Sequence, residues 1–377
     1  MNYKNAMIYT EKFRFEKGGF SVENGKFCNV LGAESEDAVD LGGAYVLPGL
    51  IDVHTHGNSG ADFSDGEVAG VEKMAAYLAK NGVTSFAPAS MTLPYETLKK
   101  AFAAAREFVD RKTPRAAALR GIQMEGPFFS EKKKGAQNGA YLRLPDYAAF
   151  AELNRSCGGL VKIVDVAPEL EGAEDFIRQA KHDCTVSIAH TDADYEAAAR
   201  GIAAGVTHLT HLYNAMPALH HRKPGVIAAA AEAEQVSAEV ISDGQHVHPA
   251  MIRMAFRLFG AARMVLISDS LRCCGMPDGE YELGGQQVFL KGGVARLADG
   301  TIAGSATNLY DCMLRAISFG IPREDAVRAA TYNPARQIGA LHEVGSIADG
   351  KTADFVLCDA ELHRKAVYLA GDKLEEK

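Results

Sequence analysis

Residues 48–56 read PGLIDVHTH, an apolar run that ends in two histidines, His54 and His56. A short apolar run bounded by a turn is typical of a buried β-strand. Since side chains alternate between the two faces of a strand, histidines two positions apart project to the same side. Two imidazoles that converge at a strand end make half of a transition-metal site. Taken alone, the pair is equally compatible with histidines on the surface or hydrogen-bonded in the core.

Runs of this kind recur through the middle of the chain and alternate with stretches of helical spacing. The expected strands are 50–54, 83–89, 119–125, 161–167, 185–190, 205–211, 236–243 and 263–269. The expected helices are 67–81, 94–111, 170–182, 193–204, 248–260, 307–319 and 322–331. Eight strands that alternate with helices predict parallel βαβ units and match the (β/α)8 TIM-type barrel of the α/β class. The main alternative is a doubly wound open sheet, but the glycine-rich phosphate loop frequent in that fold does not follow residue 54.

Both ends of the chain contain short strand-like runs separated by turns. Such runs occupy residues 7–10 near the N-terminus, and 345–347 and 353–357 near the C-terminus. The expected turns are at Gly18-Gly19, Asn24-Gly25 and Asp349-Gly350. The two ends are therefore predicted to pair into one small β-domain.

The predicted organisation has two domains. Residues 1–47 and 344–377 form a small β-sandwich, and residues 48–343 form the barrel. A glycine-rich insertion at about 275–302 contains further strand-like runs and is predicted to be a β-hairpin.

Composition narrows the class of protein. The 377 residues are 47% hydrophobic and 23% charged, which is typical of globular proteins. The formal charge of −8 argues against binding to nucleic acid or to an anionic membrane. The sequence shows no apolar stretch of the ~20 residues that a membrane helix needs, and no signal peptide. We therefore expect a cytoplasmic protein whose seven cysteines are reduced thiols.

Residues suited to metal binding and proton transfer stand at the ends of several expected strands. Besides the two histidines of the first strand, these are Glu125, His190, His211 and Asp269. In a barrel of this kind the active site lies at the C-terminal ends of the strands, so these side chains are predicted to converge. Imidazole and carboxylate suit a divalent transition metal. Individually, each residue could instead cap a turn or helix, or lie hydrogen-bonded in the core.

The sequence around these positions resembles the amidohydrolase superfamily and, within it, the N-acetylglucosamine-6-phosphate deacetylases. The similarity extends over nearly the whole chain. It is carried by the stretches PGLIDVHTHG at 48–57, EGPF at 125–128, AHT at 189–191, THLYNAM at 210–216, DGQHV at 243–247, SD at 268–269 and GSIADGKTAD at 345–354. The EGP and HLYNAM strings are typical of the deacetylase branch, and the His-x-His string is common to the superfamily.

The resemblance implies roles for the strand-end residues. Glu125, His190 and His211 would hold the principal divalent metal, which could be zinc, iron, manganese or cobalt. Since His54 and His56 are both present, a second metal per subunit is plausible. Asp269 would be the general base and acid in hydrolysis of the acetyl amide.

The resemblance also implies contacts with an amino-sugar phosphate substrate. The expected residues are Gln137, Asn214, Ala215, Arg222 and His246. Some family members carry a His where this chain has Gln137, so this residue is expected to have an auxiliary role. Arg222 is expected to pair with phosphate across the interface of a homodimer. Cys273 and Cys274 are left outside the site.

Three alternatives remain open at this point. The substrate could be N-acetylgalactosamine 6-phosphate, which differs from the gluco-sugar in the orientation of one hydroxyl. The enzyme could be another amidohydrolase that acts on a cyclic amide, although such enzymes typically place a modified lysine where Glu125 stands. An inert barrel that serves as a scaffold would be expected to have lost metal ligands or the Asp, and this chain has lost none.

Overall fold

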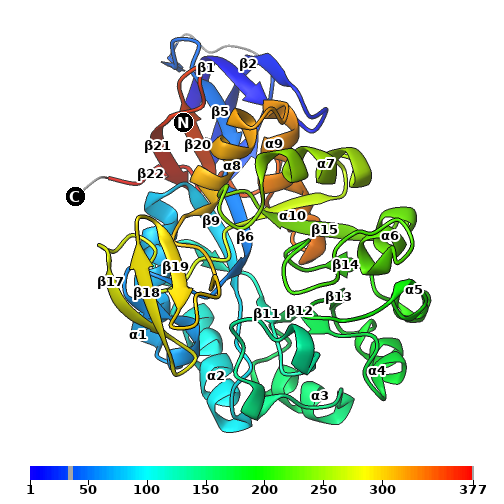
Figure 1. Ribbon diagram of the computed structural model, residues 1–377. Coiled ribbons are helices and arrows are strands. Elements are labelled where there is room, and N and C mark those ends of the chain that lie inside the picture. Colours follow the sequence, from blue (N-terminus) through cyan, green and yellow to red (C-terminus); the bar gives the residue numbers. More distant parts are fainter. Residues whose placement is uncertain (33–36, 376–377) are drawn as a thin grey trace.

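Parallel strands occupy the centre of the molecule and helices surround them (Figure 1). The computed structural model describes residues 1–32 and 37–375. The first parallel sheet has the order β10-β9-β6, and its strands are β6 (Leu50–Thr55), β9 (Val83–Pro88) and β10 (Ala118–Leu119). The second has six strands in chain order: β11 (Ile122–Met124), β12 (Val161–Val166), β13 (Thr185–Ile188), β14 (His208–Leu209), β15 (Ser237–Ile241) and β16 (Met264–Ile267). The predicted α/β class and parallel order are confirmed.

The two parallel sheets contact each other at two places. At one a parallel bridge joins Ala89, just after β9, to Gln123 on β11. At the other, the Asp269 peptide N–H donates to the His54 carbonyl at 2.9 Å, beside β16 and β6. These contacts link β9 to β11, and β6 to the residue that follows β16 by two positions.

Helices cover the outside of the parallel strands. They are α1 (Val68–Lys80), α2 (Tyr95–Arg111), α3 (Tyr147–Ser156), α4 (Ala173–Ala180), α5 (Tyr195–Ala204), α6 (Gly225–Glu232), α7 (Pro249–Phe259), α8 (Leu309–Ser318), α9 (Arg323–Ala330) and α10 (Tyr332–Gln337). In α2 the buried Leu98, Phe102 and Ala105 are spaced four and three residues apart, so one face of the helix packs inward. The sequence prediction missed α3, α6 and α10. No described helix is long and apolar enough to span a bilayer.

Three short 3-10 helices and one two-stranded sheet complete the central part. The 3-10 helices are η1 (Phe63–Asp65), η2 (Glu131–Lys133) and η3 (Gly139–Tyr141). The small sheet pairs β7 (Gly57–Asn58) with β8 (Ala61–Asp62), directly after the His-x-His stretch.

Buried polar side chains lie between the parallel strands, and Asp165 on β12 is one of them. Asp165 on β12 accepts hydrogen bonds from the Gln123 amide at 3.1 Å and from the Thr210 hydroxyl at 2.9 Å. Burial, with smaller contributions from the charges of Glu125 and Glu239, raises the pKa of Asp165 to about 8. A neutral carboxyl group is therefore expected here at physiological pH.

This neutral carboxyl group predicts a pH dependence of stability. Between the unfolded pKa of about 3.9 and the folded value, the native state holds a proton that the unfolded chain has released. The free energy of unfolding should therefore fall, relative to that of Asp165→Asn, by about 1.4 kcal/mol per pH unit as pH rises through this window. Urea denaturation of both proteins in EDTA between pH 5 and 8 measures the difference. Parallel pH profiles would contradict the assignment.

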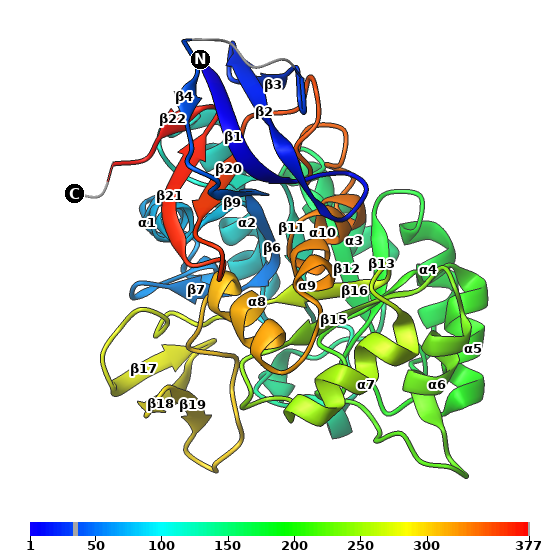
Figure 2. The same ribbon diagram turned by 90° about the horizontal axis from the view of Figure 1, so that it is seen from above.

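The two chain ends share one sheet (Figure 2, blue and red). Its order is β22-β21-β20-β5-β1-β2-β3, and β4 pairs with β1. The strands are β1 (Asn2–Tyr9), β2 (Phe15–Glu23), β3 (Lys26–Cys28), β4 (Val39–Asp40), β5 (Tyr45–Pro48), β20 (Phe355–Cys358), β21 (Arg364–Leu369) and β22 (Asp372–Lys373). The predicted pairing of the two ends is therefore observed.

The prediction of a β-sandwich is wrong, because the described strands of both ends form one sheet and not two facing ones. This sheet curls around its own aromatic cluster. Phe20 on β2 and Phe355 on β20 come from strands that are not neighbours, yet their ring centroids lie 5.2 Å apart. Strand twist allows one sheet to enclose a small core without a second sheet.

Two expected features at the chain ends are also corrected. Gly18-Gly19 lies within β2 and is not a turn. A Cβ at Gly19 would lie 2.4 Å from the Tyr3 carbonyl oxygen, so glycine here permits close approach of β1 at a bulge. Residues 345–347 form no strand, whereas Asn24-Gly25 and Asp349-Gly350 are turns as predicted.

The insertion after β16 is larger than the predicted hairpin. It contains three antiparallel strands, β17 (Gly279–Leu283), β18 (Gln286–Lys291) and β19 (Val294–Leu297). The Gln286 amide donates to the Ala136 carbonyl, so the insertion contacts the loop that follows β11. This contact places the insertion beside the strand ends.

Candidate active site

The predicted metal-binding and acid–base side chains come from the C-terminal ends of different strands and lie close together. His54 lies on β6, Glu125 directly follows β11, and His190, His211 and Asp269 each follow a strand by two residues. The last three have φ angles of 44°, 30° and 48°, in the left-handed region. Such backbone is unfavourable by about 1–3 kcal/mol and persists where surrounding structure fixes it, frequently at functional sites.

A cavity of about 210 Å³ lies at these strand ends. Of the predicted site residues, the cavity wall includes His56, Glu125, Gln137, His190, His211, Asn214, Ala215, His246 and Asp269. The β17–β19 insertion and the segment after it supply Leu283, Ile302 and Gly304. His54 lies behind the wall, fully buried, and Arg222 does not line the cavity of its own chain.

Glu125 is the centre of the cluster. Its Oε1 lies 3.0 Å from His211 Nε2 and 3.2 Å from His190 Nε2. Its Oε2 lies 3.4 Å from His56 Nε2. Its Oε1 also lies 3.6 Å from His54 Nε2, so this one carboxylate faces the imidazoles of all four histidines.

Asp269 lies opposite Glu125 across the cluster. Its Oδ1 is 3.3 Å from His56 Nε2 and 3.7 Å from His54 Nε2. Burial disfavours the charged carboxylate, but the hydrogen bond with His56 and the charge of His54 lower its pKa below the ordinary value. Asp269 is thus held as a carboxylate at the edge of the cavity.

The electrostatics of the cluster favour paired charges. Burial raises the pKa of Glu125, but hydrogen bonds with His190 and His211 outweigh it and bring the pKa well below its usual range. Burial lowers the pKa of His54, yet the charge of Glu239 raises it well above the ordinary value. A dense group of imidazoles and carboxylates of this kind is stabilised by cations, either protons or a metal.

The hydrogen bonds of the histidine rings leave nitrogen atoms available to bind a metal. His190 Nδ1 lies 2.9 Å from the Lys133 carbonyl, which can only accept, so Nδ1 carries the proton. In the neutral ring His190 Nε2 then carries the lone pair, and it lies 3.2 Å from His211 Nε2 and 3.2 Å from Glu125 Oε1. His54 Nε2 has no hydrogen-bond partner in the described part of the chain. The two triads His54–His56–Glu125 and Glu125–His190–His211 each have ligand atoms within 4.8 Å of one another.

Gln137 has a different set of partners from the one expected. Its amide nitrogen donates to Glu125 Oε2 at 2.7 Å, and its amide oxygen accepts from the Thr92 peptide at 2.7 Å. The side chain lines the cavity, but its hydrogen bonds are directed at Glu125 and the backbone. Gln137 therefore supports the Glu125 carboxylate.

His246 is held as a cation at the cavity wall. Its Nδ1 lies 2.7 Å from the Asp243 carboxylate and its Nε2 lies 2.8 Å from the Ala303 carbonyl. Because both partners are acceptors, both ring nitrogens must donate. Burial opposes this charge, but the hydrogen bond with Asp243 raises the pKa of His246 above its ordinary value.

Asn214 and Ala215 follow His211 at the same wall. The Asn214 side chain donates to the His211 carbonyl at 3.2 Å, and the Ala215 carbonyl accepts from the Thr191 peptide at 3.1 Å. These hydrogen bonds connect the segment to His211 and to Thr191, the residue after His190. Arg222 lies on the exposed loop beyond it.

Two residues that matter for the geometry were missed in the sequence. Glu239, on β15, is fully buried and contacts His54 and His208. An acidic residue in the middle of the expected strand VSAEVISD was the available signal. Gly304 packs against Asp269, and no sequence signal indicated that contact.

Gly304→Ala is expected to lower kcat/KM by about 10- to 100-fold. A displacement of a catalytic side chain by about 1 Å lowers the rate by an amount of that order. A Cβ there would lie 2.5 Å from the Asp269 carbonyl oxygen and 2.9 Å from its Oδ1, so Asp269 must move. Steady-state kinetics with Gly279→Ala as control measures this, since a Cβ at 279 meets nothing closer than 3.7 Å. Equal activity in the two variants would contradict the contact.

Comparison with known proteins places the chain in a family. The model of the Amidohydrolase family matches residues 45–374. This chain belongs to the amidohydrolase family. The match covers both parallel sheets, the insertion and the three C-terminal strands β20, β21 and β22, so the resemblance inferred from the sequence is confirmed.

Individual relatives of this amidohydrolase are amino-sugar-phosphate deacetylases. The N-acetylglucosamine-6-phosphate deacetylase of Bacillus subtilis is 35% identical over 95% of this chain and 93% of its own. The N-acetylgalactosamine-6-phosphate deacetylase of Escherichia coli O157:H7 is 34% identical over 86% of each chain. A mutant of the Mycobacterium smegmatis N-acetyl-D-glucosamine-6-phosphate deacetylase, solved with N-acetyl-D-glucosamine-6-phosphate, is 32% identical with a TM-score of 0.91, covering 99% of this chain and 98% of its own.

Proposed function

We propose that this amidohydrolase removes the acetyl group of N-acetylglucosamine 6-phosphate and releases glucosamine 6-phosphate and acetate. The observation that carries the proposal is the convergence of Glu125, His190, His211 and Asp269 on one cavity beside His54 and His56. The names of relatives at about one third identity over most of the chain support the substrate class.

The donor set fits one or two divalent metals. Glu125, His190 and His211 would hold the principal metal, and His54 and His56 a second, with Glu125 shared between them. Imidazole and carboxylate suit zinc, iron, manganese or cobalt. A divalent metal in this position would activate water and polarise the acetyl carbonyl.

Asp269 is proposed as the general base and acid. Its carboxylate takes the proton of the attacking water and then delivers that proton to the nitrogen of the departing amino sugar. The lowered pKa favours the base form at the start of the cycle. Gly304, against which Asp269 packs, keeps the carboxylate at the cavity edge.

The phosphate of the substrate is proposed to lie near His246, Asn214 and Ala215. The doubly protonated ring of His246 lies at the cavity wall, where it is paired with the Asp243 carboxylate. Asn214 and Ala215 bring polar backbone to the same wall. Gln137 contributes through its hydrogen bond to Glu125 rather than through charge.

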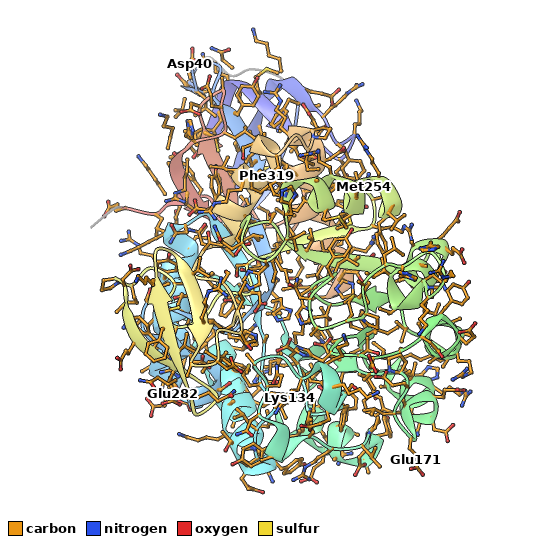
Figure 3. The ribbon with its side chains drawn as sticks, in the orientation of Figure 1. Asp40, Lys134, Glu171, Met254, Glu282 and Phe319 are labelled. Atoms are coloured by element: carbon orange, nitrogen blue, oxygen red, sulfur yellow. The ribbon has the colours of Figure 1, made fainter. Side chains whose placement is uncertain are left out.

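Arg222 is proposed to complete the phosphate site of a second subunit in a homodimer. The nearby surface is unusually apolar, because Leu219, Met251, Met254 and Leu258 are 36–46% exposed. Figure 3 marks Met254 on α7. The Tyr213 hydroxyl donates to the Met251 carbonyl at 3.3 Å, which ties the loop after His211 to this helix.

Arg222→Ala is expected to raise KM by about 10- to 100-fold with kcat nearly unchanged, since a hydrogen bond to a charged group contributes about 1.5–3 kcal/mol. Lys223→Ala in the same exposed loop is the control. An equal mixture of Arg222→Ala and Asp269→Asn subunits, assayed well below the wild-type KM, should reach about a quarter of wild-type activity, because about half of the dimers are mixed and each of these has one intact site of two. No recovery on subunit exchange would contradict the contribution across the interface.

We also propose that the chain has two domains. Residues 48–343 would form a closed (β/α)8 barrel, and residues 1–47 and 344–377 a small β-domain. The two contacts between the parallel sheets, Ala89 with Gln123 and Asp269 with His54, support closure. The shared sheet of the chain ends supports the second domain.

The galacto-epimer is the second candidate substrate, and the similarity to the E. coli N-acetylgalactosamine-6-phosphate deacetylase favours keeping it. The test is acetate release from both sugar phosphates by metal-reconstituted enzyme, with initial rates over a range of concentrations. A higher kcat/KM for the gluco-sugar supports the proposal, and a higher value for the galacto-sugar replaces it with the second candidate. No release from either would overturn both.

A further inference from the structure

A buried carboxylate lies directly behind the candidate metal cluster. Glu239 is on β15 and has no exposed surface. Its Oε2 lies 3.1 Å from His54 Nδ1 and accepts from the His211 peptide N–H at 3.2 Å, and its Oε1 lies 3.0 Å from His208 Nε2. One carboxylate therefore joins β6, β14 and the residue that follows β14 by two positions.

These contacts determine which nitrogen of His54 faces the cluster. A carboxylate oxygen can only accept, so His54 Nδ1 carries a proton and donates it to Glu239. The other nitrogen, Nε2, lies 3.6 Å from Glu125 Oε1 and 3.7 Å from Asp269 Oδ1. Within the described residues it has no hydrogen-bond partner, so it is available to a cation.

His208 keeps the carboxylate itself from rotating. Its ring is fully buried, and the hydrogen bond from Nε2 occupies the second oxygen of Glu239. The His211 peptide adds a third donor. A buried charge needs partners of this kind, because an unpaired carboxylate in the interior is strongly unfavourable.

We propose that Glu239 is a positioning residue for the second metal, holding His54 so that Nε2 points at the cation. The inference rests on the metal-dependent function proposed above. Hydrogen bonds from a ligating imidazole to a carboxylate fix ring orientation and raise the basicity of the ligand.

The support is specific to His54 among the histidines of the two triads. His190 Nδ1 faces a neutral carbonyl, that of Lys133. For His56 and His211, the Nδ1 atoms have no hydrogen-bond partner in the described part of the chain. Loss of Glu239 should therefore weaken the metal at His54 and His56 more than the metal at Glu125, His190 and His211.

The test compares zinc binding by wild type, Glu239→Leu, Glu239→Gln and His208→Gln. Each protein is loaded with zinc and dialysed against buffers of graded chelator strength, and zinc per subunit is measured by mass spectrometry. Circular dichroism checks that each variant is folded. We expect two zinc ions in wild type, of which Glu239→Leu keeps one, because the second is bound at least about 10- to 100-fold more weakly.

The two glutamine variants separate positioning from general packing. In Glu239→Gln the amide oxygen can still accept from His54 Nδ1, so this variant should keep the second zinc better than Glu239→Leu. In His208→Gln the new amide can still donate to Glu239, so both zinc ions should remain near wild-type affinity. Loss of the second zinc in His208→Gln as large as in Glu239→Leu would overturn the inference.

An NMR readout makes the test independent of turnover. In zinc-loaded wild type with ¹⁵N-labelled histidine, a slowly exchanging Nδ1–H signal is expected, assigned to His54 by its absence in His54→Gln. The signal should disappear in Glu239→Leu. Retention of both zinc ions and of this signal in Glu239→Leu, or a single zinc in wild type, would overturn the inference. Absence of deacetylation with these binding results intact would overturn the proposed function alone.

Discussion

Asp269→Asn should lower kcat for deacetylation by about 10²- to 10⁴-fold, the usual contribution of a positioned general base or acid. The amide has nearly the shape of the carboxylate but cannot take a proton from water. Asp269 belongs to neither candidate metal triad, so the imidazoles and Glu125 should still bind metal in this variant. The loss should therefore fall on catalysis.

The measurement is kcat and bound metal in the same samples of wild type and Asp269→Asn. Comparable metal content with the expected loss of kcat assigns proton transfer to Asp269. Unchanged kcat would remove Asp269 from the mechanism. A variant that has lost its metal would show that Asp269 acts as a ligand.

Glu125→Gln should abolish metal binding and lower activity by about 10³-fold or more, because the chemistry that activates water depends on the metal. Glu125 is the carboxylate common to both candidate metal triads. A neutral amide cannot balance the charge of two cations, and its NH2 group would face imidazole nitrogens. Both metals should therefore be lost together.

His54→Gln is the matched control for Glu125→Gln. His54 belongs to one triad only, so this variant should retain the metal held by Glu125, His190 and His211. Metal analysis after dialysis, together with initial rates, distinguishes the two variants. Two metals retained in Glu125→Gln would contradict a shared carboxylate.

The sequence predicted the central strands because each is a short buried apolar run. Residues 50–54, for example, lie within β6, and residues 263–269 contain β16. The strand ends then placed Glu125, His190, His211 and Asp269 together, since the carboxyl ends of parallel strands share one edge. The prediction of 205–211 was too long, because β14 is only His208–Leu209.

Contacts between distant loops could not be predicted in the same way. The pairing of Gln137 with Glu125 and of His246 with the Ala303 carbonyl depends on how the loops fold over the strand ends. Neither contact produces a periodic pattern in the sequence from which it could be predicted. The curl of the terminal sheet around Phe20 and Phe355 likewise depends on twist and packing, so one sheet was mistaken for a sandwich.

The most direct test of the account is a metal titration of catalysis. The enzyme is stripped with a chelator, and acetate release from N-acetylglucosamine 6-phosphate is followed as zinc, iron, manganese or cobalt is added in steps. The account predicts no turnover in the stripped enzyme and recovery that parallels metal bound per subunit. Full turnover by the metal-free enzyme would contradict it.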